Sequence, residues 1–145
     1  MKIASVAFED NGTIPPDYTC DGENISPPLS IADVPEEAKS LVLIIDDPDA
    51  PEGIFTHWIL FNIPPETEDI DEDDVPEGAR QGLNSNDNAG YTGPCPPGGI
   101  HHYHFRLYAL DNTLNFPSPP NKEDIEDAME GRTIDQAELV GLYGT

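Results

Sequence analysis

Apolar residues occur in short runs separated by turn residues, which is the pattern of an all-β protein. The clearest run, residues 40–45 (SLVLII), is apolar at almost every position, so we expect a central strand covered on both faces. Residues 58–63 (WILFNI) form a second run and are expected to pair antiparallel with the first. Alternation at 3–8 predicts a first strand, and residues 105–110 (FRLYAL) extend another strand into the core.

The remaining chain offers few helix signals. Asn121 suits a helix N-cap, acidic residues follow it in the first turn, and Gly131 suits the stop, which predicts one helix of about ten residues. Residues 34–39 allow a single helical turn with proline near its start. The acidic segment 66–77 and residues 78–93 are expected to be loops. Residues 137–144 fit either a last strand or a helical turn that runs into a strand.

The stretch from residue 90 to 105 (GYTGPCPPGGIHHYHF) joins a loop rich in glycine and proline to a strand rich in histidine. Successive strand side chains point to opposite faces. His101 and Tyr103 therefore share one face with Phe105, while His102 and His104 point the other way. We expect His101 and Tyr103 to converge on one ligand, and we expect His102 and His104 to be ordinary core or surface residues that do not contact it.

A second stretch, residues 46–58 (DDPDAPEGIFTHW), has the same build and carries His57, so all four histidines lie in these two segments. We therefore expect one pocket between them. Imidazole and phenol groups beside Asp47 and Asp49, with backbone N–H groups left uncovered by Gly93, Gly98 and Gly99, suit a phosphate or carboxylate ligand. These residues also have purely structural interpretations. DPDAP can be only a rigid turn in which Asp47 caps backbone N–H groups, and Tyr103 can belong to the core.

Two further chemistries compete with anion binding as interpretations of these residues. A zinc site would need histidines at a diagnostic spacing from a carboxylate, and only His102 and His104 form such a pair. Cys95 could act as a nucleophile with His57 or His101 as base, but its proline-rich turn provides no helix N-terminus to lower the pKa of the thiol. We therefore expect no bound metal, no cofactor and no catalytic residue.

The chain has 145 residues, which predicts a single domain over residues 1–145. Six basic residues stand against 29 acidic ones, giving a formal charge of −23. This charge argues against nucleic-acid binding, which needs cations to neutralise phosphates, and against anionic membrane surfaces. Because molar salt screens carboxylate repulsion, we interpret the charge as adaptation to a halophile's cytoplasm.

The compartment is expected to be the cytoplasm. The first residues lead into a strand pattern without the apolar core of a signal peptide, and no window resembles a membrane span. Cys20 and Cys95 are therefore expected to be free thiols rather than a disulfide, since reducing cytosol disfavours bridges. The sequence leaves open whether the protein is a monomer or a homodimer.

Several motifs resemble those of one known family. DPDAP followed by His57 and Trp58, the segment GYTGPCPPGGIHHY and LYALD at 107–111 are similar to the phosphatidylethanolamine-binding proteins, also called Raf kinase inhibitor proteins. YTCDGENISPPL near the start and AELVGLYG at the end resemble its short prokaryotic YbhB/YbcL branch. The resemblance covers essentially the whole chain. It implies a β-sandwich of two antiparallel sheets with Greek-key connections, a small helical element and one shallow pocket for phosphate-like anions and phospholipid head groups.

The resemblance also implies the pocket residues, which are Asp47 with Asp49 behind it, His57, Gly93, Pro94, His101 and Tyr103. One departure is His102, which stands where an arginine is common in the family and weakens any positive rim. We therefore expect a non-enzymatic binding protein for a small anion, such as a phospholipid head group or a phosphorylated small molecule. The alternatives are an inhibitor or modulator of a kinase or peptidase, acting on an unidentified protein partner, and a weak histidine-dependent hydrolase.

Overall fold

The computed structural model describes residues 1–144 and is mainly β, as the sequence predicted. Two sheets form the body of the molecule, one of three strands in the order β1-β3-β6 and one of six in the order β2-β9-β8-β4-β5-β7. The strands are β1 (Lys2–Ala4), β2 (Gly12–Thr13), β3 (Leu29–Ala32), β4 (Ser40–Asp47), β5 (Phe55–Ile63), β6 (Asp69–Ile70), β7 (Arg80–Gln81), β8 (Ile100–Leu110) and β9 (Thr133–Gly144), with a short 3-10 helix η1 (Pro16–Tyr18) and an α-helix α1 (Lys122–Met129).

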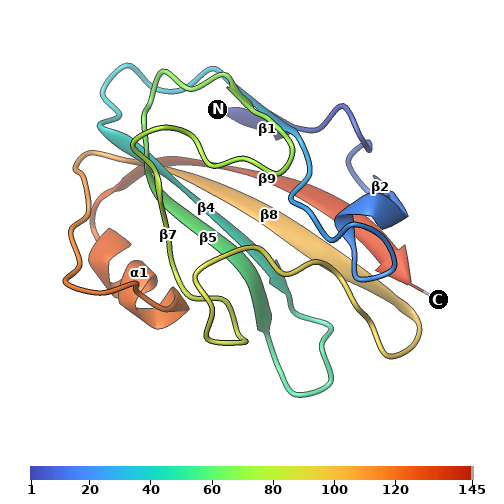
Figure 1. Ribbon diagram of the computed structural model, residues 1–145. Coiled ribbons are helices and arrows are strands. Elements are labelled where there is room, and N and C mark those ends of the chain that lie inside the picture. The colour runs from blue at the N-terminus through green and yellow to red at the C-terminus, as the bar shows by residue number, and fades with distance from the viewer. Residues whose placement is uncertain (145) are drawn as a thin grey trace.

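The long strands pair antiparallel, and their register sets which residues face the pocket. In Figure 1, β8 and β9 run side by side across the molecule, with α1 near one end and the C-terminus near the other. β4 lies between β5 and β8, so Asp46 is opposite both Thr56 and His104. The two antiparallel sheets are present as predicted, with one local departure at an edge, where the two-residue strand β2 pairs parallel with β9.

β4 is buried at every position, as its unbroken apolar run predicted. Alternate residues serve two cores. Leu41, Leu43 and Ile45 pack in the larger cluster, which joins the six-stranded sheet to β1, β3 and β6. Val42 and Ile44 face the smaller cluster, which is shared with α1. The strand is thus covered on both faces.

The predicted helix is present as α1. The Asn121 side chain accepts from the Asp124 N–H at 2.8 Å and the Asp124 side chain accepts from the Asn121 N–H at 3.1 Å, which is a reciprocal capping box. Gly131, with φ of 76°, stands just after the helix. Lys122 Nζ lies 3.3 Å from the buried Asp46 carboxylate and ties the helix to β4. Within residues 1–144, no helix is long and apolar enough to cross a membrane.

Several shorter predictions were wrong or incomplete, and one open alternative is resolved. The first strand ends at Ala4, because the Ser5 hydroxyl donates to the Pro28 carbonyl and accepts from the Ala7 N–H, which turns the chain. Residues 34–39 form a hydrogen-bonded turn instead of a helical turn. The two expected loops at 66–77 and 78–93 contain β6 and β7, each of two residues. The ambiguous segment 137–144 is entirely strand, within β9.

Candidate functional site

A cavity of about 230 Å³ opens where the ends of β4, β5 and β8 meet the loop that precedes β8. It brings together four of the predicted side chains, Asp47, His57, His101 and Tyr103, together with the Gly93 backbone. The complete lining is Asp47, Ala50, Pro51, Phe55, His57, Asn86, Thr92, Gly93, Cys95, Pro96, Pro97, His101 and Tyr103. The two histidine-bearing stretches therefore do share one pocket.

Asp47 and His101 form a buried pair at the base of this pocket. Nδ1 of His101 donates to Oδ2 of Asp47 at 2.7 Å, and the other oxygen, Oδ1, accepts from the Asp49 N–H at 2.8 Å. The whole residues are only 3% and 7% exposed. Both carboxylate oxygens are thus engaged, so Asp47 orients the His101 ring and leaves Nε2 as that ring's remaining nitrogen.

His57 is oriented by the chain opposite it. Its Nδ1 lies 2.7 Å from the Thr92 carbonyl oxygen, while the Thr92 N–H donates to the His57 carbonyl at 3.0 Å. A carbonyl oxygen only accepts, so Nδ1 carries the proton and Nε2 remains for the cavity. Burial lowers the pKa of His57 below its usual 6.5, against the opposing influence of the Thr92 carbonyl and the Asp47 charge.

Tyr103 packs between the two histidines. Its ring meets His57 edge-on with centroids 5.2 Å apart and lies nearly parallel to His101 at 6.4 Å. Burial, followed by the negative charges of Asp47 and Asp49, raises the pKa of Tyr103. The phenol therefore stays protonated and can donate a hydrogen bond to a ligand.

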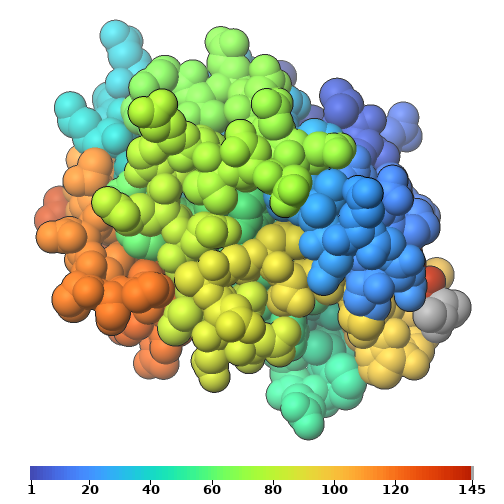
Figure 2. Space-filling view, viewed as in Figure 1, coloured from blue at the N-terminus to red at the C-terminus, as the bar shows by residue number. Residues whose placement is uncertain are grey.

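The loop before β8 is fastened to the segment around residues 18–24. The Gly93 N–H donates to Oδ1 of Asn24 at 2.8 Å, and the Pro94 carbonyl accepts from the Cys20 N–H at 3.1 Å. Figure 2 shows this contact as yellow atoms lying against blue ones. A Cβ on Gly93 would collide with Asn24 and with the Tyr18 carbonyl, so the close approach requires glycine.

These contacts correct part of the predicted site. The Gly93 N–H is already used by Asn24 and is not an open anion donor. Pro94 is buried but does not line the cavity, and its carbonyl anchors the loop instead. Gly98 and Gly99 are exposed and also lie outside the cavity wall.

The prediction of free thiols is wrong, because Cys20 and Cys95 form a disulfide whose Cα atoms are 5.4 Å apart. The two cysteines are 75 residues apart, so no local sequence pattern indicates that they pair. The expected reducing compartment favoured free thiols. The bridge joins the same two segments as the hydrogen bonds at Gly93 and Pro94. It therefore fixes one wall of the cavity, to which Cys95 contributes.

Asp49 does not reach the cavity. Its carboxylate accepts from the backbone N–H of His102 at 2.9 Å and lies 2.7 Å from Nδ1 of the same residue, on the exposed face of β8. These bonds lower the pKa of Asp49. His104 lies 3.1 Å from Glu138 on that outer face. His102 and His104 thus point away from Tyr103, as strand alternation predicted.

Sequence reasoning missed Phe55, Asn86 and Thr92 in the cavity wall. Phe55 could have been found, because it stands two residues before His57 and so shares its strand face; the ring centroids are 4.7 Å apart. Asn86 and Thr92 lie in irregular chain, where no periodicity indicates direction.

The polar side chains that line the pocket include two imidazoles, a phenol and the Asp47 carboxylate. Within residues 1–144, no lysine or arginine lines the cavity, and no group of three or more His, Cys, Asp or Glu side chains is arranged to hold a metal ion. The groups left to face a ligand are Nε2 of His57, Nε2 of His101 and the Tyr103 hydroxyl. This set can hold one small oxyanion if the imidazoles carry protons.

Comparison with known proteins identifies the family of this chain. A family model described as phosphatidylethanolamine-binding protein matches residues 4–144. A UPF0098 protein of Methanothermobacter thermautotrophicus is 53% identical over 148 residues, covering 99% of this chain and 98% of the relative.

Two crystal structures are also similar. A phosphatidylethanolamine-binding protein homologue from Chlamydia trachomatis has a TM-score of 0.95 at 44% identity, covering 99% of this chain and 97% of the other. E. coli YbcL, described as a member of the mammalian family, has a TM-score of 0.89 at 30% identity, covering 99% and 98%. The chain therefore belongs to the phosphatidylethanolamine-binding protein family.

Proposed function

We propose that the protein is a non-enzymatic binding protein whose pocket holds a phosphate-like or carboxylate group of a small molecule, such as a phospholipid head group. Family membership supports a binding function, and the prokaryotic YbhB/YbcL branch is the one we favour. One observation favours an anion as the ligand. Three buried polar side chains, His57, His101 and Tyr103, line the cavity, and Nδ1 of each histidine is held by the Thr92 carbonyl or the Asp47 carboxylate, which leaves both Nε2 atoms and the Tyr103 hydroxyl to meet a ligand.

Protonation decides how such an anion is held. In neutral His57, Nε2 is an acceptor and would repel an oxyanion, because the ring proton sits on Nδ1 toward Thr92. Binding therefore takes up a proton from solvent or uses a ligand that brings its own, as a hydrogen phosphate does. A protonated His57 then offers a charge-assisted hydrogen bond, while Tyr103 donates without any change of charge.

The surroundings of the cavity favour a ligand with an apolar part. A neighbouring groove of about 490 Å³ shares Ala50, Pro51, Phe55 and Asn86 with the cavity. The groove continues to Ile54, which is 60% exposed. An anionic group in the cavity would therefore leave the rest of its molecule against Pro51, Ile54 and Phe55. A phosphomonoester with a short carbon chain fits this better than free phosphate.

The test is calorimetric titration of the protein with glycerol 3-phosphate and with inorganic phosphate. We expect the double variant His57→Ala and His101→Ala to lose at least about tenfold in affinity, as removal of charge-assisted bonds does. His102→Ala with His104→Ala, on the opposite face of the same strand, is the matched control and should bind as the wild type does.

Tyr103→Phe removes one hydroxyl and keeps the ring, so it separates lost binding from lost folding. We expect it to melt at nearly the wild-type temperature and to bind more weakly. Unchanged affinity in both pocket variants would overturn the proposal.

A weak hydrolase is a second candidate, favoured by the buried Asp47–His101 pair. Asp47 holds Nδ1 of His101, so Nε2 could take a proton from a water that attacks an ester and return it to the leaving oxygen. We expect any turnover of p-nitrophenyl phosphate or p-nitrophenyl acetate to disappear in His101→Ala. Absence of turnover in the wild type would remove this candidate.

A further inference from the structure

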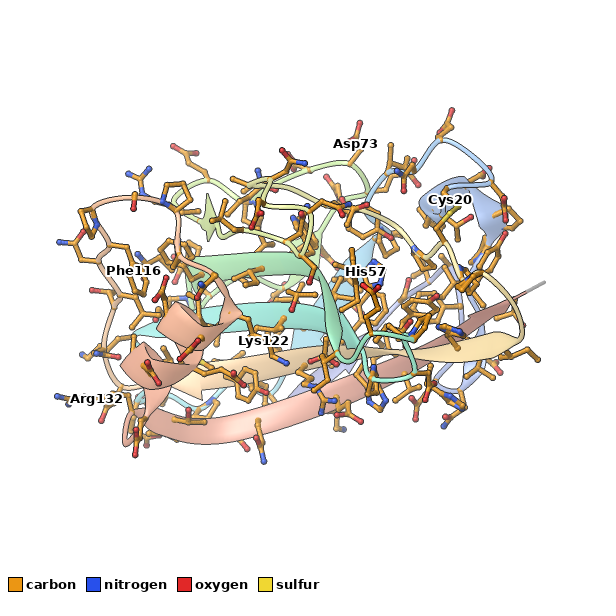
Figure 3. All side chains as sticks on the ribbon, turned by 90° about the horizontal axis from the view of Figure 1, so that it is seen from below. Cys20, His57, Asp73, Phe116, Lys122 and Arg132 are labelled. Carbon is orange, nitrogen blue, oxygen red and sulfur yellow. A yellow bond between two sulfur atoms is a disulfide. The ribbon has the colours of Figure 1, made fainter. Side chains whose placement is uncertain are left out.

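A second cavity lies along β7, at the edge of the six-stranded sheet, and shares no lining residue with the anion pocket. It has a volume of about 570 Å³, which is within the usual range for ligand sites. Phe61, Val75, Ala79, Arg80, Gln81, Ala89, Asn115, Phe116, Pro117, Ser118 and Pro119 line it. Figure 3 labels Phe116, which lies near one end of the sheet, and His57, which lies nearer its middle. We call this cavity the β7 groove.

The floor of the β7 groove is aromatic. Phe61 is buried in β5 and meets Phe116 edge-on, with ring centroids 5.4 Å apart. Phe116 is only partly buried, and the prolines that follow it at 117 and 119 are exposed. The groove thus offers a small apolar surface to solvent beside its polar groups.

Arg80 stands at the edge of this floor. The β5–β7 register pairs it with Phe61, so both side chains are on the same face of the sheet. Within residues 1–144, Arg106 and Lys122 share the Asp46 carboxylate, whereas no carboxylate forms an ion pair with Arg80. With 29 acidic side chains available, an exposed and unpaired guanidinium beside an apolar floor suits an anionic group from outside.

The backbone beside Arg80 is also open. β7 is the edge strand of its sheet, and the Gly82 N–H donates to the Ile59 carbonyl at 2.9 Å. Antiparallel residues alternate in direction, so the peptide N–H and C=O of Gln81 point away from β5. The next outward N–H, that of Leu83, donates to the Pro120 carbonyl at 2.7 Å. Among the described residues, the Gln81 N–H and C=O have no backbone partner, so they form a short free edge in the wall of the groove.

We propose that the β7 groove binds the carboxyl terminus of a peptide whose last residue is aromatic or large and apolar. The terminal carboxylate pairs with Arg80, which can hold it with two parallel hydrogen bonds. The last side chain packs on Phe61 and Phe116. The peptide backbone hydrogen-bonds the free edge at Gln81, as in β-strand addition. Charge, apolar contact and main-chain pairing together favour a peptide end over a small organic acid, which would leave the Gln81 edge unused.

The experiment uses two synthetic peptides, acetyl-Gly-Ser-Leu-Phe with a free carboxyl end and the same peptide as an amide. Binding is followed by amide chemical-shift changes in the full chain, at the lowest salt in which it stays folded. We expect the acid to shift the signals of Arg80 to Gly82 and of Phe116, and the amide to bind at least about tenfold more weakly.

Arg80→Gln should lower the affinity for the acid peptide by the same factor and leave the affinity for the amide peptide unchanged. Arg132→Gln, at another exposed arginine with only a loose contact to Asp111 of 3.8 Å, is the matched control and should bind as the wild type does. Equal affinity for acid and amide, no shifts at millimolar peptide, or phenylacetate binding as tightly as the peptide would each overturn the proposal. The last result would make the groove a small-molecule site.

Discussion

Nδ1 of His101 donates to Oδ2 of Asp47 across 2.7 Å, and both side chains are almost closed to solvent. β8 and β4 supply the two residues, 54 positions apart. A buried ionisable pair of this kind is costly to break, because the surviving partner is left without its hydrogen bond.

Replacing Asp47 by alanine should therefore reduce the free energy of unfolding by about 2–4 kcal/mol. Asp49→Ala is the matched control, since its pair with His102 is on the exposed face; it should cost less than about 1 kcal/mol. Urea unfolding of the two variants measures both. Equal losses would show that burial of the Asp47 pair contributes nothing particular to stability.

Anion affinity should fall as the pH rises from 5 to 8. Burial holds the pKa of free His57 below 6.5, and a bound anion favours the protonated ring, so a proton is taken up on binding. Over the range where this uptake occurs, affinity changes by up to about tenfold per pH unit. Titration with sulfate, whose charge is constant in this range, measures the dependence in buffers of different ionisation enthalpy.

His57→Asn is the informative variant for this prediction, because asparagine can still donate to the Thr92 carbonyl but cannot gain a charge. Its sulfate affinity should be lower and should vary less with pH. A flat profile for the wild type would exclude protonated His57 as the anchor.

The disulfide should be closed in the purified protein and should stabilise it. The bond joins residues 75 positions apart in the sequence and so reduces the entropy of the unfolded chain. In the loop-closure treatment this raises the free energy of the unfolded state by about 4 kcal/mol. Cys20→Ser with Cys95→Ser should lower the free energy of unfolding by up to this amount. Thiol titration under denaturing conditions should find no thiol before reduction and two after it. Two reactive thiols in the unreduced protein would contradict the pairing.

The charge of −23 leads to a prediction about salt. Carboxylate repulsion extends over several residues in dilute buffer and is largely screened at about 1 M salt, where the Debye length is ~3 Å. We expect a cooperative melt at a higher temperature in molar KCl than in dilute buffer. Equal melting temperatures in both solutions would refute the interpretation of this chain as halophilic.

Local patterns in the sequence were enough to predict part of the fold and part of the pocket. Strand alternation placed His101 and Tyr103 on one face and His102 on the other, and the unbroken apolar run identified β4. Periodicity cannot reveal strands of two residues, so β6 and β7 were missed. Their pairing depends on partners distant in sequence.

The loops of the pocket were predicted less well for the same physical reason. The Gly93 N–H was expected to face a ligand, yet it donates to Asn24, 69 residues away. Cys20 and Cys95 are brought together by the same contact between segments. Asp49 was assigned to the pocket behind Asp47 through the DPD motif of the family, although its carboxylate turns outward to His102. In each case, the direction of a group is set by long-range contacts that no local pattern encodes.

The most direct test of the central claim is a crystal structure of the protein grown in molar salt and soaked with glycerol 3-phosphate. We predict density for the phosphate within hydrogen-bond distance of Nε2 of His57, Nε2 of His101 and the Tyr103 hydroxyl, with the glycerol directed toward Phe55. A pocket that stays empty at saturating ligand, or a phosphate bound only at Arg80, would contradict the assignment of this cavity as the anion site.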